Sequence, residues 1–140
     1  MKRENLVRVV VDTNVIVSAL INPYGAPASV LGLILEEKIE LCYDSRMLIE
    51  YEQVLKRKKF GFNEVEVNSL IDFLKETGNI VVAIKSNLTI KDPGDLPFLE
   101  VASISGADYL ITGNSSHFPE KIGTTKVVSP SEFIRLNFKL

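Results

Sequence analysis

The feature that most constrains the fold of this chain is a set of short runs in which apolar residues follow one another instead of alternating with polar ones. A strand with one face in water alternates apolar and polar residues, whereas a strand in a parallel sheet is buried on both faces and stays apolar throughout. The first run, "VVVDTN", ends in a carboxylate. We expect strands over residues 7–12, 39–43, 79–84 and 108–112, with a weaker fifth over residues 125–129.

Between these runs lie segments with helical spacing of apolar residues. We expect helices over residues 29–37, 45–60, 63–78, 95–106 and 129–138. Ser45 is a suitable N-cap, and Asn63 with Glu66 three residues later has the pattern of a capping box. Strands that alternate with helices predict a three-layer α/β/α domain over residues 1–140, with a mainly parallel sheet of four to five strands.

Composition excludes several kinds of protein. The chain has 140 residues with one cysteine and one histidine, so an internal disulfide is impossible and a Cys/His zinc site is not expected. Any metal site should be built of oxygen ligands. No apolar stretch approaches about 18 residues, and the N-terminus has no secretory pattern, so we expect a cytoplasmic protein without a membrane span. The net charge of −2 is not that of a general nucleic-acid binder, although a local basic patch is possible.

Polar residues gather where the predicted strands end. Asp12 ends the first strand, Thr112 and Asn114 follow the fourth, Asp95 opens the helix before it, and Glu50 lies on the helix after the second strand. Ligands of open parallel sheets bind beyond the carboxyl ends of the strands. Carboxylates that converge there repel one another, and Mg²⁺ or Mn²⁺ would relieve that repulsion.

Each of these residues also has a purely structural interpretation. Asp12 and Asp95 could cap the helices that follow them, Glu50 could be a solvated helical residue, and Asn114 could be a turn residue. Taken singly, none of them defines a site.

Three motifs together resemble the PIN-domain family. They are "VVVDTNVIVSAL", "SRMLIEYEQVLKRKKF" and "DPGDLPFLEVASISGADYLITGNSSHFP", in this order, and the resemblance runs from about Val9 to Pro130. The chain looks most like the stand-alone prokaryotic members that act as VapC-like toxins of toxin–antitoxin pairs. The resemblance implies a PIN-like fold and a metal-dependent ribonuclease whose acidic residues surround Mg²⁺ or Mn²⁺.

Carried over by position, the resemblance assigns roles to particular residues. Asp12, Glu50 and Asp95 match the first three acids and are the expected metal ligands and catalytic residues. The fourth catalytic place, commonly an aspartate, is Asn114, which lowers the charge of the site. The chemistry suggests supporting roles in positioning water or phosphate for Thr13, Asn14 and Thr112.

Two further features have competing interpretations. His117 could serve as a general acid, but a structural role in "SSHFP" is favoured. The run Lys56, Arg57, Lys58 and Lys59 could be a solvated helix end that complements the helix dipole, or a patch that grips an RNA backbone beside the acidic site.

The sequence therefore predicts a Mg²⁺- or Mn²⁺-dependent endoribonuclease that is the toxin of such a pair. The alternatives are another PIN-type nuclease acting on single-stranded or structured DNA or RNA, and a catalytically weak interaction module. The expected partners are an RNA substrate, a small antitoxin protein and a second copy of the chain. The homodimer rests on apolar residues that need cover, such as Leu70, Ile71, Phe73 and Leu74.

Overall fold

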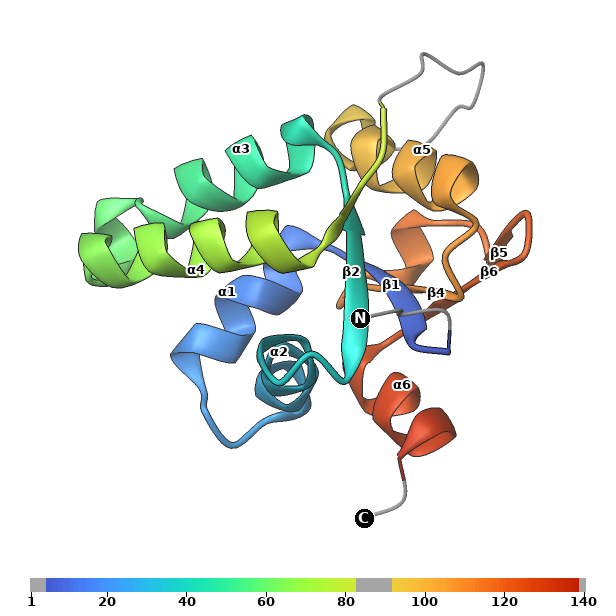
Figure 1. The fold of residues 1–140 in the computed structure, drawn as a ribbon, viewed down its shortest axis with the longest axis horizontal. Coiled ribbons are helices and arrows are strands. Elements are labelled where there is room, and N and C mark those ends of the chain that lie inside the picture. Colours follow the sequence, from blue (N-terminus) through green and yellow to red (C-terminus); the bar gives the residue numbers. More distant parts are fainter. Residues whose placement is uncertain (1–4, 83–91, 139–140) are drawn as a thin grey trace.

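The computed structural model describes residues 5–82 and 92–138, and the predicted apolar runs form a central sheet within these ranges (Figure 1). In chain order the elements are β1 (Val7–Val11), α1 (Thr13–Ile21), α2 (Ala26–Leu35), β2 (Ile39–Tyr43), α3 (Ser45–Leu55), α4 (Glu64–Thr77), β3 (Asn79–Ile80), α5 (Leu96–Ser105), β4 (Tyr109–Ile111), β5 (Lys121–Ile122), β6 (Thr125–Val128) and α6 (Pro130–Asn137). Single 3-10 turns lie at Lys58–Phe60, Pro93–Asp95 and Ser115–His117.

The sheet has the strand order β3-β2-β1-β4-β6-β5. All neighbouring strands are parallel except β5 and β6, which form an antiparallel hairpin at one edge. β2 and β4 lie on opposite sides of β1, so the strand order of the sheet reverses at β1. The predicted α/β fold class is confirmed, and the short strand β5, which the sequence did not predict, is the sixth strand.

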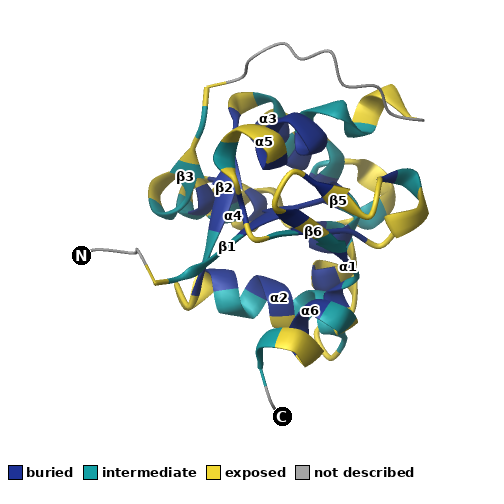
Figure 2. Cartoon of the chain, turned by 90° about the vertical axis from the view of Figure 1, so that its right-hand side faces the viewer, coloured by how far each residue is buried: buried dark blue, intermediate teal, exposed yellow. Residues whose placement is uncertain are grey.

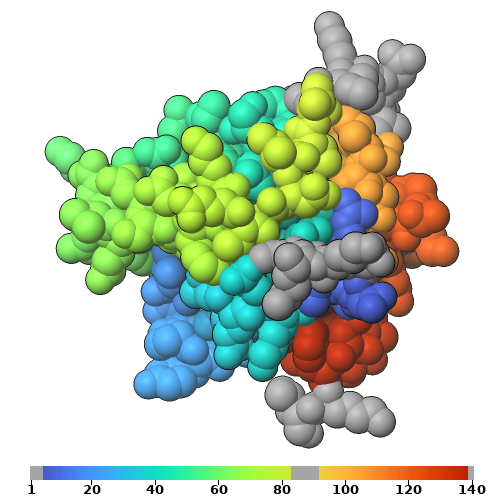
Figure 3. All heavy atoms as spheres, viewed as in Figure 1, coloured from blue at the N-terminus to red at the C-terminus, as the bar shows by residue number. Residues whose placement is uncertain are grey.

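Helices cover both sides of the sheet. Figure 2 shows α3 and α5 on one side and α2 and α6 on the other, with the buried strands between them. Val9, Val10 and Val11 are fully buried, as expected for a central strand covered on both faces. Helices α3 and α4 run beside each other and project away from the sheet, toward the left of the view in Figures 1 and 3.

Some predicted boundaries need correction. The N-cap of α3 is Asp44, whose carboxylate accepts a hydrogen bond from the backbone N–H of Met47, and not Ser45. The same helix ends at Leu55 instead of continuing to Phe60, because Arg57 adopts an extended conformation before the 3-10 turn. The cap at Asn63 is confirmed, since its side chain accepts from the N–H of Glu66 at 3.0 Å.

Two other predicted elements shift as well. The helix predicted from residue 29 begins at Ala26, because Pro27 fits the first turn of a helix. The third strand is limited to Asn79–Ile80 among the described residues, and residues 83–84 of the predicted strand lie outside the described ranges.

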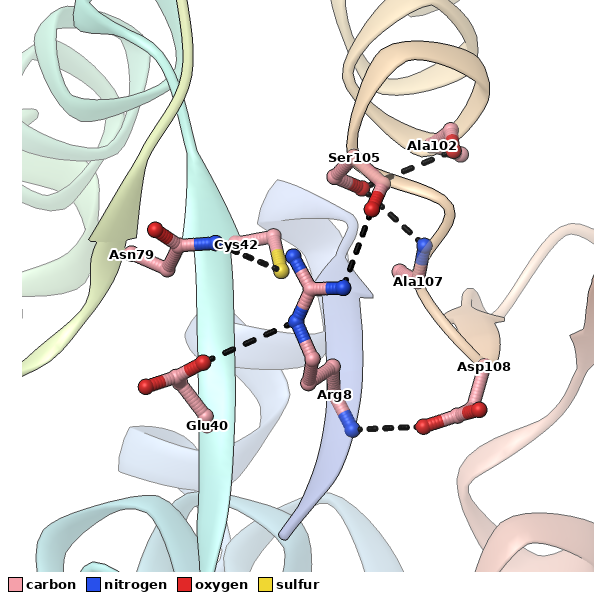
Figure 4. Close-up of polar contacts among 8 residues, drawn as sticks. All are labelled: Arg8, Glu40, Cys42, Asn79, Ala102, Ser105, Ala107 and Asp108. Carbon is pink, nitrogen blue, oxygen red and sulfur yellow. Dashed lines mark hydrogen bonds and ion pairs between the residues drawn. The ribbon is translucent and has the colours of Figure 1, made fainter. Parts of the chain in front are cut away.

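Arg8 links several segments at the amino end of the sheet (Figure 4). Its guanidinium donates to the carbonyl of Ser105 at 3.0 Å and lies 3.6 Å from the carboxylate of Glu40, while its backbone N–H donates to Asp108. Cys42 lies nearby on β2 and is buried, and this burial raises the pKa of its thiol. A buried thiol of raised pKa is a packing residue rather than a nucleophile.

Over residues 5–82 and 92–138, no single helix combines the length and apolar character that a membrane crossing requires. Helices α1 and α2 meet that criterion only as a pair, across a bend of 101°.

Candidate functional site

The carboxyl ends of β1 and β4 lie side by side and bring the first predicted site residues together. Val11 pairs with Ile111 in the sheet, so Asp12 and Thr112 follow at the same edge. The Thr112 hydroxyl donates to Oδ2 of Asp12 at 2.7 Å, and the Asn14 amide donates to the same oxygen at 3.3 Å. This edge lies where the strand order reverses, which is where ligands bind in open parallel sheets.

Asp12 is not acting as a helix cap. It occupies the N-cap position of α1, but its side chain makes no capping hydrogen bond. Asp95 occupies the corresponding position before α5 and likewise makes no side-chain cap bond. The structural interpretation of these two carboxylates is therefore wrong, and both remain available for chemistry.

Contacts from α3 and from the loop after β4 hold the chain around Asp12. The hydroxyl of Tyr51, which is fully buried on α3, donates to the carbonyl of Val11. The N–H of Gly113 donates to the Asn14 amide oxygen at 3.2 Å, and the N–H of Asn114 donates to the Thr112 hydroxyl at 3.0 Å. These contacts fix the loop after β4 against the start of α1.

Glu50 reaches the same region from the second turn of α3. The hydroxyl of Thr13 donates a hydrogen bond to Oε2 of Glu50, which links the residue after Asp12 directly to the second predicted acid. Thr13 thus orients a carboxylate, and its predicted role in positioning water or phosphate stays a prediction.

Asp95 belongs to a tight group with Asp92 and His117, whose ligating atoms all lie within 4.8 Å of one another. The Nδ1 atom of His117 lies 3.6 Å from Oδ2 of Asp95. Asp92 also accepts a hydrogen bond from the N–H of Gly94, so it is both a turn residue and a neighbour of the site. Asp12 and Glu50 lie outside this tight group.

The carboxylates nonetheless influence one another. Burial raises the pKa of Asp12 from 3.8 to about 6, and the charges of Asp95 and Glu50 add to this rise, while the hydrogen bond from Thr112 opposes it. Burial also raises the pKa of Asp95, with a further contribution from Asp92 and an opposing one from His117. The site therefore concentrates negative charge that the protein itself neutralises only in part.

A cleft of about 550 Å³ opens beside these residues. It is lined by Thr13, Asn14, Val17, Ser18, Glu50, Gln53, Val54, Arg57, Phe60, Asp92, Gly94 and Asp95. Asp12 is only 6% exposed and lies against the cleft through its neighbours Thr13 and Asn14. Residues from α1, α3, the segment after α3 and the segment before α5 thus share one concave surface.

The basic run divides into residues with different roles. Arg57 lines the cleft, whereas Lys56 pairs with Glu52 at 2.7 Å on α3. Lys58 and Lys59 are exposed and do not line the cleft. Of the four basic residues, Arg57 therefore lines the cleft wall and the three lysines do not, because the chain turns after α3.

Asn114 is exposed, and its side chain makes no cap bond to the 3-10 turn that follows it. Asn114 contacts the site through its backbone N–H, which donates to the hydroxyl of Thr112.

Sequence reasoning missed Asp44 and Arg46 beside the site. Asp44 is buried at the end of β2, and Arg46 bridges it to the buried Glu100, with N–O distances of 2.8 Å to each carboxylate. Glu100 thus pairs with this arginine and does not line the acidic cleft. The "DSR" that follows β2 was the available signal, because a strand that ends in an aspartate is the same pattern as at Asp12.

The donor set fits a hard divalent cation. Asp12 is a buried carboxylate with a raised pKa, and further carboxylates at Glu50, Asp92 and Asp95 lie around one cleft. Carboxylate oxygens are the ligands that Mg²⁺ and Mn²⁺ prefer.

Comparisons with known proteins agree with this arrangement. Residues 8–116 match the PIN domain. The chain is 34% identical to the uncharacterized protein MJ1680 of Methanocaldococcus jannaschii, over 91% of this chain and 90% of that protein. Its fold is similar to a chain of the crystal structure of VapBC2 from Rickettsia felis bound to a DNA fragment from their promoter. That match has a TM-score of 0.58 and 19% identity, and covers 87% of this chain and 98% of the other. The family match and the acidic cleft lead to one conclusion: this chain belongs to the PIN-domain family, whose members are nucleases.

Proposed function

We propose that this protein is a metal-dependent endoribonuclease that hydrolyses RNA phosphodiester bonds. The observation that carries the proposal is that Glu50 and Asp95, from separate segments, line one cleft on the carboxyl edge of the sheet, and that their charges act on the buried carboxylate of Asp12 beside it. Membership of a nuclease family supports the reaction class, and the choice of RNA is part of the proposal.

Asp12, Asp95 and Glu50 would hold Mg²⁺ or Mn²⁺. When bound, such an ion supplies an activated water at neutral pH and offsets charge on the phosphoryl oxygens. The two hydrogen bonds to Oδ2 of Asp12 fix the orientation of this carboxylate, and the hydroxyl of Thr13 does the same for Glu50. Preorganised ligands of this kind need little rearrangement during the reaction.

Arg57 on the cleft wall, and His117 and Asn114 nearby, would have supporting roles toward the substrate or the carboxylates. Arg57 places a permanent positive charge on the cleft wall, where it can pair with a phosphate of the substrate. His117, next to Asp95, can hold that carboxylate in place when the imidazole is protonated. The side chain of Asn114 would contact water or substrate from the exposed side of the site.

The test is cleavage of labelled single-stranded RNA by the purified protein with Mg²⁺, with Mn²⁺ and with EDTA. We expect cleavage that requires a metal, is lost in Asp12→Asn and persists in Asp72→Asn, a matched change at an exposed aspartate of α4. Thermal unfolding should show that both variants are folded. Absence of cleavage with either metal would contradict the proposal, and preferred cleavage of single-stranded DNA would favour the alternative nuclease.

We further propose that the protein is the toxin of a toxin–antitoxin pair in the cytoplasm. The fold similarity to a chain of the VapBC2 complex supports an antitoxin as partner. The expected antitoxin is a small protein encoded nearby that inserts a segment into the acidic cleft. Co-expression with the neighbouring reading frame should yield a stable complex with suppressed cleavage, and a neighbour that neither binds nor inhibits would argue against this role.

A homodimer remains part of the proposal. Ile71 and Leu74 are buried within the chain itself, but Leu70 and Phe73 line an apolar groove of about 400 Å³. Light scattering at micromolar concentration should give twice the chain mass of 15.6 kDa. A monomeric mass would exclude the dimer under those conditions.

A further inference from the structure

An aromatic side chain stands on the wall of the acidic cleft. Phe60 lines the same cleft as Glu50 and Asp95, together with Arg57. It comes from the 3-10 turn that follows α3, and Gly61 closes that turn with a left-handed φ of 65°. The sequence offered no aromatic residue as a nucleic-acid contact beside the basic run, and the fold supplies one.

The ring of Phe60 is supported from behind. It stacks on Phe62 with a centroid separation of 5.5 Å and an interplanar angle of 11°. Phe62 in turn lines the apolar groove that also contains Phe73 and Leu20. The stacked pair thus separates this groove from the acidic cleft, and Phe60 is held in place while remaining only half-buried.

The cleft therefore carries three kinds of group on one surface: carboxylates suited to a metal, a guanidinium suited to a phosphate, and a flat aromatic ring. Proteins that bind single-stranded nucleic acid combine a positive contact to the backbone with aromatic rings on which bases stack. Bases within a duplex are already stacked on their neighbours and cannot reach such a ring.

We propose that Phe60 is a stacking platform for an unpaired nucleobase beside the scissile phosphate, with Arg57 contacting an adjacent phosphate. The inference rests on the proposed ribonuclease function and narrows its substrate class to single-stranded RNA.

Lys59 competes for the same ring. Its Nζ lies 5.1 Å from the centroid of Phe60. A cation–π contact at an exposed site contributes less free energy than the stacking of one base on an aromatic ring. An entering base therefore displaces the exposed ammonium, which is then free to pair with a phosphate.

Binding measurements test this directly. All proteins carry Asp12→Asn to prevent turnover, and their affinity for a short single-stranded RNA is measured by fluorescence anisotropy in Mg²⁺. The variants are Phe60→Leu, which keeps apolar volume without an aromatic face, and Phe60→Tyr, which keeps the face. The matched control is Tyr24→Leu, since Tyr24 is 94% exposed in a different groove. A 2-aminopurine in the RNA reports stacking by its quenching.

We expect Phe60→Leu to weaken single-strand binding by about tenfold and to abolish the quenching. Phe60→Tyr and Tyr24→Leu should bind like the parent. The duplex of the same sequence should bind the parent more weakly than the single strand does, and this difference should shrink in Phe60→Leu. Equal affinity of Phe60→Leu and the parent, or equal binding of duplex and single strand, overturns the inference. Metal-dependent cleavage is measured separately with protein that keeps the native Asp12. If this protein cuts RNA but Phe60→Leu binds RNA as well as the parent, the nuclease function stands and the role of Phe60 is rejected.

Discussion

The hydroxyl of Thr112 donates a 2.7 Å hydrogen bond to Oδ2 of Asp12, although the two residues are 100 positions apart in the chain. The same hydroxyl oxygen accepts the N–H of Asn114 at 3.0 Å. Because that oxygen already accepts from one side, its proton is directed toward the carboxylate. Thr112 therefore fixes which oxygen of Asp12 is occupied by the protein.

Replacing Thr112 with valine removes this hydrogen bond while keeping the side-chain shape. We expect kcat/KM for RNA cleavage to fall by about 10- to 100-fold, the usual effect of removing a group that orients a metal ligand. The matched control is Thr125→Val, since Thr125 is equally buried but bonds the carbonyl of Ala107. Steady-state kinetics of folded protein should show the loss only in the first variant; similar losses in both would indicate a general packing effect.

Asp12 should give the metal-free protein an unusual dependence of stability on pH. Its pKa rises from 3.8 to about 6 on folding, so between these values the native state keeps a proton that the unfolded chain has released. The native state binds more protons there, and the free energy of unfolding falls as pH rises through this window, by about 3 kcal/mol.

The variant Asp12→Asn lacks this titration. Urea unfolding in EDTA at pH 4 and pH 7 should show that the wild type loses stability relative to the variant as pH rises. The comparison cancels the titration of groups that do not interact with Asp12, while Asp95 and Glu50, whose charges act on it, contribute to the difference. A difference between the two proteins that does not change with pH would show that Asp12 titrates normally.

If Asn114 occupies the place of a fourth acid, as the resemblance to the PIN-domain family implies, Asn114→Asp should strengthen metal binding. An added carboxylate near Asp12 and Asp95 raises the negative charge available to a divalent cation. Titration calorimetry with Mn²⁺ should show an affinity several times higher than that of the wild type. Asn68→Asp, a matched change at an exposed position on α4, should leave the affinity unchanged. An unaltered affinity in Asn114→Asp would place this side chain outside the metal environment.

Arg46 should be a major source of stability next to the site. It bridges Asp44 and Glu100, both almost completely buried, so Arg46→Ala leaves two carboxylates in the interior without this cation. We expect a loss of about 1–3 kcal/mol in the free energy of unfolding, because the two carboxylates are buried while the guanidinium is 38% exposed. The control Lys56→Ala removes a surface pair with Glu52 and should cost less than Arg46→Ala. Equal losses would mean that the buried bridge contributes no more than a surface pair.

The fold was predictable where local pattern and burial agree. The run of valines at residues 9–11 is buried on both faces in the structure, and β2 has the predicted bounds. Local pattern could not distinguish Asp44 from Ser45 as a cap, since both residue types cap helices well. It also could not predict the end of α3 at Leu55, because the lysines and arginine that follow are good helix formers.

The sequence predicted Asp12 at a strand end, Asp95 at a helix start and Glu50 on the helix after the second strand as residues of one site. The structure places Glu50 and Asp95 in one cleft beside the buried Asp12, and the roles of these carboxylates stay predictions. The partnership of Arg46 with Glu100, and the choice of Arg57 over its lysine neighbours for the cleft, depend on packing between distant elements. No periodicity within either segment encodes those choices.

The distance along the chain between Asp12 and Thr112 has a consequence for how the protein acquires its activity. The first acid is synthesised early, but β4, which holds it in place, comes 100 residues later. Closing so long a loop costs conformational entropy and can happen only when the intervening chain exists. A growing chain therefore carries an incomplete site through most of its synthesis, and the contact that holds Asp12 forms only after β4 has been made. If the proposed ribonuclease function holds, that order keeps unfinished copies from cutting the RNA of their own cell.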